Sequence, residues 1–202
     1  VRNELSNIID TSNFFVAFYN KATGMMRAPF ERELDILEEW PADKSLSGCV
    51  VKQKRSLLLS KDQISEMAEK GIIKLIGSRS EKWLGVPLFK GKTAIGAMVV
   101  QSYDNPHAYN EDSKYILELA AHELGNYISR KEAEQHAIKL SKAIEQNPVS
   151  IVITDKEGFI EYVNPKFTAI TGYTLDEAIS KKPSILKSGE QSIEFYTELW
   201  DT

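Results

Sequence analysis

The sequence has few of the side chains that build redox and metal sites. Among 202 residues there is one cysteine, Cys49, and there are three histidines, His107, His122 and His136. A single cysteine excludes an intrachain disulfide and a cysteine-rich zinc site. The carboxylates are plentiful, but none forms an acid–base pair that the sequence alone identifies. We therefore assign no catalytic residue, no metal site and no cofactor to this chain.

Long apolar runs and a strong charge of one sign are also missing. No run approaches the roughly 20 apolar residues that a bilayer-spanning helix needs, and the first residues show no secretory pattern. Lys and Arg number 25 against 29 Asp and Glu, which gives a net charge of −4 without a basic stripe. This balance argues against a nucleic-acid partner. We expect a cytoplasmic protein with no membrane segment in this stretch.

The first hundred residues contain the signals of an antiparallel sheet. Residues 83–89 and 94–100 are the strongest strands, and Lys90 to Thr93 between them is typical of a hairpin turn. Pro87 predicts an edge position or a bulge at that point, because proline cannot donate to a strand ladder. The remaining elements expected here are a short helix within 1–10, strands at 14–19, 25–30 and 57–59, and helices at 47–54 and 61–70.

A single long helix is predicted over 111–146. Asn110 supplies an N-cap, and no proline follows until Pro148. About 36 residues at 1.5 Å each would extend about 54 Å. Its middle is polar, and Ala137, Leu140 and Ile144 then resume an apolar stripe. So sparse a stripe favours pairing with a second copy as a parallel coiled coil; the alternative is a solvated linker helix that is held only at its ends.

The boundaries of the elements are most clearly marked from Asn147 to Tyr173. Residues 150–154 form a β-branched strand, and the turn after it ends at Gly158 before a returning strand at 159–163. Asn164 then caps a helix that has Pro165 at its first position. A helix stop at Gly172 and a capping box from Thr174 to Glu177 complete the series.

Residues 144–202 resemble the first half of a PAS domain, the sensory module of histidine kinases and cyclic-dinucleotide enzymes. The resemblance implies that 148–202 lacks three further strands. Because two strands alone are marginal, we expect 148–202 to be either poorly ordered or stabilised by the long helix, by a second chain, or by an irregular packing that the complete domain would not show. The resemblance is carried by Asn147-Pro148, Ile153-Thr154-Asp155, Gly158, Tyr162-Val163-Asn164-Pro165, Phe167, Thr171-Gly172-Tyr173, Lys182 to Gly189, Phe195-Tyr196 and Leu199-Trp200.

A second set of motifs lies within residues 4–131: Leu46-Ser47-Gly48, Trp83 to Leu88, Ile95-Gly96 and Tyr109 to Asp112. On these residues, 4–131 resembles a GAF domain, another small-ligand sensor. The two resemblances imply an α+β fold with a central antiparallel sheet, flanking helices on one face, and a ligand pocket on the other. The domains expected are GAF-like 1–131, a linker helix 132–147, and a partial PAS segment 148–202. The candidate ligand-binding residues are Phe15, Cys49, Trp83, Tyr103 and Asp104.

Residues that would mark special chemistry in these families are absent at the matching positions. His122-Glu123 is not followed by the proline that is typical of the phosphoacceptor box of histidine kinases. Cys49 lacks the neighbouring histidine of bilin-binding GAF domains, and Pro183 stands where flavin photoreceptors have their reactive cysteine. No histidine lies in the PAS-like segment, which argues against haem. Flavin in a completed PAS domain stays open without direct support.

The resemblances together imply a sensory fragment, itself without catalytic activity, of a multidomain signal-transduction protein. A small ligand or partner would act on the GAF-like part, and the linker helix of a homodimer would carry the change toward a C-terminal output domain beyond Thr202. A sensor histidine kinase is the expected context, with a cyclic-dinucleotide enzyme as the other. The alternatives are a ligand-free dimerisation and relay scaffold or a flavin-binding redox sensor.

Overall fold

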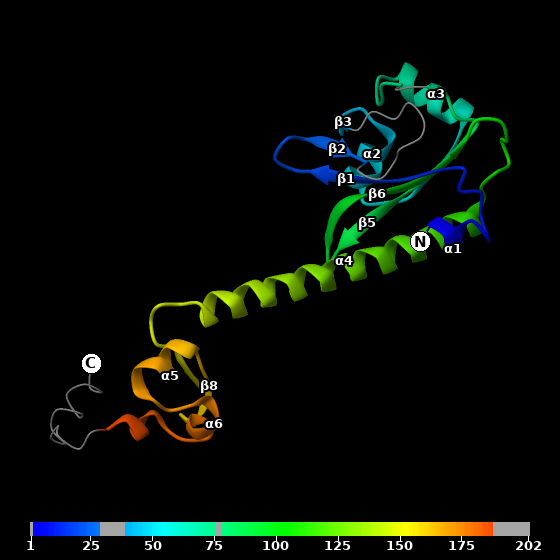
Figure 1. Ribbon diagram of the computed structural model, residues 1–202. Coiled ribbons are helices and arrows are strands. Elements are labelled where there is room, and N and C mark those ends of the chain that lie inside the picture. The colour runs from blue at the N-terminus through cyan, green and yellow to red at the C-terminus, as the bar shows by residue number, and fades with distance from the viewer. Residues whose placement is uncertain (1, 29–38, 76–77, 188–202) are drawn as a thin grey trace. The chain divides into compact units, whose positions relative to one another are not determined.

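The computed structural model describes residues 2–28, 39–75 and 78–187 of the chain (Figure 1). The chain divides into two compact units, residues 1–132 and 133–202, and each is considered by itself. The first unit is built around a sheet of six antiparallel strands. Their spatial order is β3 (Glu39–Pro41), β2 (Met25–Arg27), β1 (Asn13–Asn20), β6 (Thr93–Ser102), β5 (Lys82–Lys90) and β4 (Leu57–Ser60).

The β5–β6 hairpin is the longest pairing of this sheet and follows the sequence prediction. Gly91 adopts a φ of 57° in its turn, a backbone conformation that glycine enters at little cost. Strand β4 pairs with β5 only as far as Gly85, so Pro87 has a ladder neighbour on one side alone. The register also shifts between Leu88 and Phe89. Pro87 therefore faces an unpaired side of β5 next to a bulge, as its presence in the strand predicted.

The sheet separates two hydrophobic cores because side chains alternate between its faces. Phe15 and Ala17 of β1 belong to one core, together with residues of α2 (Leu46–Gln53) and α3 (Lys61–Glu69). Phe14 of β1 belongs to the other, with residues of α1 (Arg2–Leu5) and α4 (Glu111–Glu145). Helices therefore cover both faces of the sheet, whereas the GAF resemblance predicted helices on one face only. Figure 1 shows α4 passing along the sheet below β5.

The helices match their predicted ranges with small differences at the ends. Helix α4 has 35 residues and ends at Glu145, one residue before the predicted end. The helix expected within 1–10 is shorter in the structure and spans Arg2–Leu5, and the Ile8 and Ile9 amides donate to the Leu5 carbonyl in the turn that follows. Of the return strand predicted for 25–30, β2 covers Met25–Arg27, and residues 29–30 lie outside the described part.

The second unit contains a two-stranded hairpin and short helices. Its elements are β7 (Val152–Thr154), β8 (Ile160–Val163), α5 (Pro165–Thr171), α6 (Leu175–Ala178) and the 3-10 helix η1 (Pro183–Leu186). The Asp155 carboxylate accepts hydrogen bonds from the amides of Glu157 and Phe159, which closes the turn. Gly172 has a φ of 80° and ends α5 as predicted.

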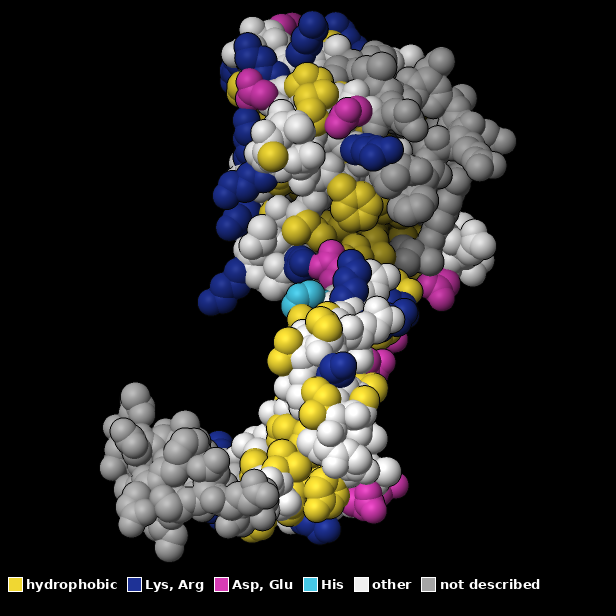
Figure 2. All heavy atoms as spheres, turned by 60° about the vertical axis from the view of Figure 1, so that its left-hand side comes forward, with side chains coloured by type: hydrophobic (Ala, Val, Ile, Leu, Met, Phe, Trp, Pro, Cys, Tyr) yellow, Lys and Arg dark blue, Asp and Glu magenta, His cyan; other side chains and the backbone are white. Residues whose placement is uncertain are grey.

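The core of this unit is small. It consists of Ile160, Val163, Phe167 and Ala178, with Val152 and Ile185 packed against it. Hydrophobic side chains also lie on its surface, as Figure 2 shows. Two strands and a core of this size provide little independent stability. The exposed large hydrophobic residues among the described residues that follow α4 are Val149, Ile153, Phe159, Ile170, Tyr173, Leu175, Ile179 and Leu186.

The capping box of α6 should make the stability of this helix depend on pH. The Glu177 carboxylate accepts hydrogen bonds from the backbone amide and the hydroxyl of Thr174, and these bonds lower the pKa of Glu177. A carboxyl whose pKa falls on folding stabilises the fold above its unfolded-state pKa, and this contribution is lost as the pH drops through the lowered value. We expect the Thr174 amide resonance to report α6 opening in acid. In Glu177→Gln this titration should vanish, and a persisting titration would contradict the assignment.

Candidate functional site

The structure brings three of the five candidate ligand residues together. Phe15, Cys49 and Trp83 belong to the hydrophobic cluster between the sheet and α2. Tyr103 and Asp104 follow the last residue of β6 and are exposed, so they lie outside this cluster. Tyr103 accepts a hydrogen bond from the Gln101 side chain, and Asp104 accepts one from the Ser102 hydroxyl. The first three residues therefore define the candidate sensor cluster.

Trp40 is a further member of this cluster. Its ring meets the Phe15 ring edge-on, with centroids 6.0 Å apart and planes at 81°. Its indole Nε1 donates to the Ser47 hydroxyl of α2 at 3.2 Å. Aromatic pairs of this geometry are stabilising, and the polar tip of a buried tryptophan requires a partner. Trp40 thus connects β3, β1 and α2.

Because Gly48 has no side chain, the start of α2 can lie close to the preceding loop. The Ser45 hydroxyl caps the helix by accepting from the Gly48 amide at 3.1 Å. A Cβ atom at position 48 would lie 1.8 Å from the Ala42 carbonyl oxygen, a backbone atom that cannot turn away as a side chain can. The Leu46-Ser47-Gly48 motif therefore meets a local packing requirement, and it places Cys49 in the first turn of α2.

The environment of Cys49 disfavours thiol chemistry. The side chain is partly buried, and this desolvation raises the pKa of the thiol, with a smaller raising effect from Asp43. Lys52 acts in the opposite direction. Because the thiolate is the reactive form, the raised pKa lowers the reactive fraction of Cys49 at neutral pH.

We expect Cys49 to react with dithionitrobenzoate more slowly than free cysteine at neutral pH, because a raised thiol pKa lowers the thiolate fraction and partial burial restricts access to the sulfur. Lys52→Gln should slow the reaction further, since it removes the one charge that favours the thiolate. The measurement is the rate of thiol release followed by absorbance. A rate equal to that of free cysteine would contradict the buried environment.

Helix α4 lies against the other face of the sheet through one stripe of residues. Ser113, Leu117, Ala121 and Gly125 are buried and spaced by four, so they share one side of the helix. A Cβ atom at Gly125 would lie 2.0 Å from the Phe89 carbonyl oxygen of β5. The absence of a side chain at Gly125 is therefore what lets α4 approach the backbone of the sheet.

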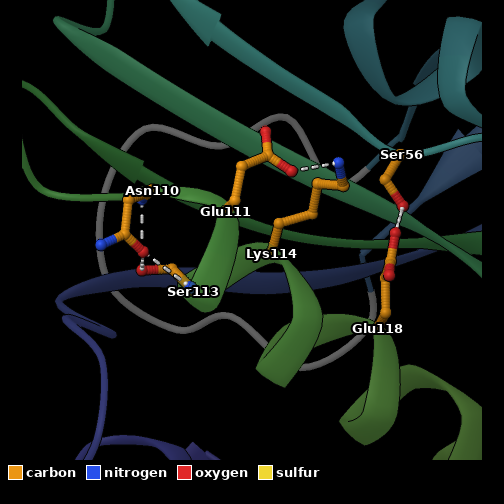
Figure 3. A network of polar contacts seen from close by, with 6 residues as sticks. All are labelled: Ser56, Asn110, Glu111, Ser113, Lys114 and Glu118. Carbon is orange, nitrogen blue, oxygen red and sulfur yellow. Dashed lines mark hydrogen bonds and ion pairs between the residues drawn. The ribbon is translucent and has the colours of Figure 1, made fainter.

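Polar contacts fasten the start of α4, and Figure 3 shows them together. The Asn110 side chain accepts from the amide and the hydroxyl of Ser113, and the Asn110 amide donates back to that hydroxyl. One turn further, the Glu118 carboxylate accepts a hydrogen bond from the Ser56 hydroxyl at 2.5 Å. Ser56 lies between α2 and β4. Helix α4 is thereby linked to the segment that connects α2, which carries Cys49, to β4.

Beyond the sheet, α4 is exposed on all sides. Every residue from Arg130 to Ala143 is exposed, including Ile138 and Leu140. Of the stripe predicted for a coiled coil, Ala137 and Leu140 are open to solvent and Ile144 is half-buried. His122 is also exposed, in line with its interpretation as a surface residue.

Two kinds of site are absent from the part of the chain that the structure describes. Within it, no three His, Cys, Asp or Glu side chains gather as a metal site would require. No helix there combines the length and the hydropathy needed to cross a membrane.

The second unit matches a known sequence family. Residues 139–202 match the PAS fold family. The chain is also similar to the nitrogen fixation regulatory protein of Klebsiella pneumoniae, with 36% identity over 69 residues, which cover 34% of this chain and 14% of that protein. The protein of the same description from Klebsiella oxytoca is similar to the same extent. The chain thus spans only a small part of the length of these relatives.

The first unit is similar to solved GAF domains in its fold. The GAF domain of a phosphoenolpyruvate-protein phosphotransferase from Coxiella burnetii superposes with a TM-score of 0.50 at 16% identity. The match covers 61% of this chain and 74% of that domain. At this identity the similarity shows the fold alone. The chain therefore combines a GAF-type fold with a segment of the PAS fold, as the sequence predicted.

Proposed function

We propose that this chain is the sensory part of a longer signal-transduction protein, in which a small ligand or partner acts on the GAF-type unit and helix α4 relays the change. One observation carries the proposal: the helix whose buried stripe packs against the sheet continues without a break into the PAS-type unit. The name of the Klebsiella relatives, nitrogen fixation regulatory protein, supports a regulatory role.

The two cores of the sheet suggest how the signal would start. Neighbouring residues of β1, such as Phe14 and Phe15, belong to opposite cores, so a single strand carries side chains of both. A ligand that displaces the candidate sensor cluster therefore also displaces the strands on which α4 rests. Such a ligand shifts an equilibrium only by its difference in affinity for the two states. A change in the packing of α4 on the sheet is the proposed second state.

A parallel homodimer in the cytoplasm completes this proposal, with a sensor histidine kinase as the favoured whole protein. The support is the stripe of Ala137, Leu140 and Ile144, whose first two members are exposed in the single chain. We expect light scattering to give twice the 22.8 kDa mass of the chain. A monomer at all concentrations would remove the dimer from the proposal.

Deleting Gln135, next to Glu134, tests the relay. Residues 130–143 are exposed on all sides, so the deletion should cost little stability while it turns the following helix by about 100° relative to the preceding part. We expect the signal dependence of the output of the longer protein to be lost or inverted. The matched control is Gln135→Ala, which keeps the length and should leave the output unchanged. Normal signal dependence after the deletion would contradict a relay through this helix.

A ligand-free relay scaffold is the second candidate. It is favoured by the close packing of the sensor cluster, where Trp83 is 3% exposed and its ring fills the space above Gly85. Denaturing mass spectrometry of natively purified protein separates the two candidates, because a co-purifying small molecule supports the sensor and its repeated absence supports the scaffold. The absorption spectrum of the same sample tests the remaining flavin alternative.

A further inference from the structure

Asn164 is a fully buried side chain of the second unit that makes four hydrogen bonds. It is 0% exposed and caps α5 through its Oδ1, which accepts from the Phe167 amide at 3.1 Å. The same oxygen accepts from the Ile151 amide at 2.8 Å. Its Nδ2 donates to the carbonyl oxygens of Val149 at 2.9 Å and Ile144 at 3.2 Å. An asparagine amide has two donors and an acceptor oxygen with two lone pairs, and all four are used here.

The bond to Ile144 reaches the last turn of α4. In a continuing helix the Ile144 carbonyl would accept from the amide of residue 148, but that residue is Pro148 and has no amide hydrogen. The Asn147 amide at 3.3 Å and the Asn164 side chain replace that missing partner. A helix cap for α5 alone would need only the Oδ1 of Asn164. The two donors are thus directed at the end of α4 and the connection after it.

We propose that Asn164 is a positioning residue that couples the end of α4 to the strand and helix of the PAS-type unit, so that the two fold and open together. A displacement of the last turn of α4 must either break this bond or move the side chain that holds Ile151 and the start of α5. This coupling would form part of the proposed relay. Its structural basis does not depend on the relay, and only its biological purpose rests on that proposed function.

The pair Asn164→Asp and Asn147→Asp tests the coupling by hydrogen exchange. Asn164→Asp keeps the acceptor oxygen but removes the two donors. Asn147→Asp is the matched control, because the side chain of Asn147 makes only an Oδ1 hydrogen bond, from the Val149 amide, among the described residues. It also places the same negative charge near the same helix end. The readouts are the protection factors of the Gln146 amide, at the end of α4, and the Phe167 amide, in α5.

In Asn164→Asp we expect the protection of Gln146 to fall by at least about tenfold, because both Nδ2 hydrogen bonds of a fully buried side chain are lost, with a smaller change at Phe167. In Asn147→Asp both amides should keep their protection within about twofold. Equal protection of Gln146 in the two variants would overturn the coupling. So would a loss confined to Phe167, because that pattern would identify Asn164 as a cap for α5 only.

The wild-type chain provides a second measurement in case Asn164→Asp does not fold. If the coupling holds, the Gln146 amide should exchange through the same opening as the amides of β8 and α5, with the same dependence on denaturant. Exchange of Gln146 by independent fraying, insensitive to denaturant, would refute it. The relay has its own test in the Gln135 deletion, so failure of the coupling and failure of the relay give different results.

Discussion

Gly125→Ala will destabilise the first unit. In an exposed helix the same substitution stabilises the helix by about 1 kcal/mol, because alanine has a higher helix propensity than glycine. The added Cβ would lie 2.0 Å from the Phe89 carbonyl oxygen, so α4 or β5 must move. Forced rearrangements of this kind typically cost about 1–3 kcal/mol. We expect the clash to outweigh the gain in propensity and the free energy of unfolding to fall.

The control for this variant is Asn126→Ala, at the next position of the same helix. Asn126 is exposed, so its replacement should improve helix propensity without any clash. Urea unfolding followed by tryptophan fluorescence measures both variants, because Trp40 and Trp83 lie in the first unit. Stabilisation by Gly125→Ala of the size seen in an exposed helix would show that α4 does not rest on the sheet at this point.

Leu117→Ala is expected to have the largest effect of all. Leu117 is 0% exposed and packs in the core between α4 and the sheet. Truncation of a fully buried leucine costs about 2–5 kcal/mol, because apolar contact is lost and a cavity remains. The free energy of unfolding of the first unit should fall by that amount in urea, and α4 should separate from the sheet at lower denaturant concentration.

Leu119→Ala is the matched control, with the same chemical change two residues away. Leu119 is 54% exposed and therefore loses little packing when it is shortened. Surface substitutions of this kind usually stay within about 0.5 kcal/mol. Similar losses for Leu117→Ala and Leu119→Ala would mean that α4 packs through a different side, and the relay would then need another starting contact.

The sequence predicted those parts of the fold that short-range hydrogen bonds determine. The turn at Gly158, the cap at Asn164 and the stop at Gly172 all lie where local signals placed them. The β5–β6 hairpin and the long helix were also predicted within a few residues. Each of these depends on residues that are close in sequence, so composition and spacing contain the needed information.

Long-range contacts could not be predicted in the same way. The sheet places β1 beside β6, and β3 at its edge is only three residues long, too short for a periodic pattern. Tyr103 and Asp104 were candidate ligand residues together with Phe15, but the two residues after the end of a strand can turn to solvent, as they do here. The sequence marked Asn164 as a helix cap, yet its bond to Ile144 depends on how α4 ends before Pro148.

The exposed stretch from Arg130 to Ala143 also bears on how such proteins recombine. Because no core residue lies in it, a gene fusion joined there would leave both the sheet contacts before it and the Ile144 contact after it intact. The number of residues across the joint would have to stay the same to keep the helical turn, and Ala137 and Leu140 would have to be retained for the proposed dimer.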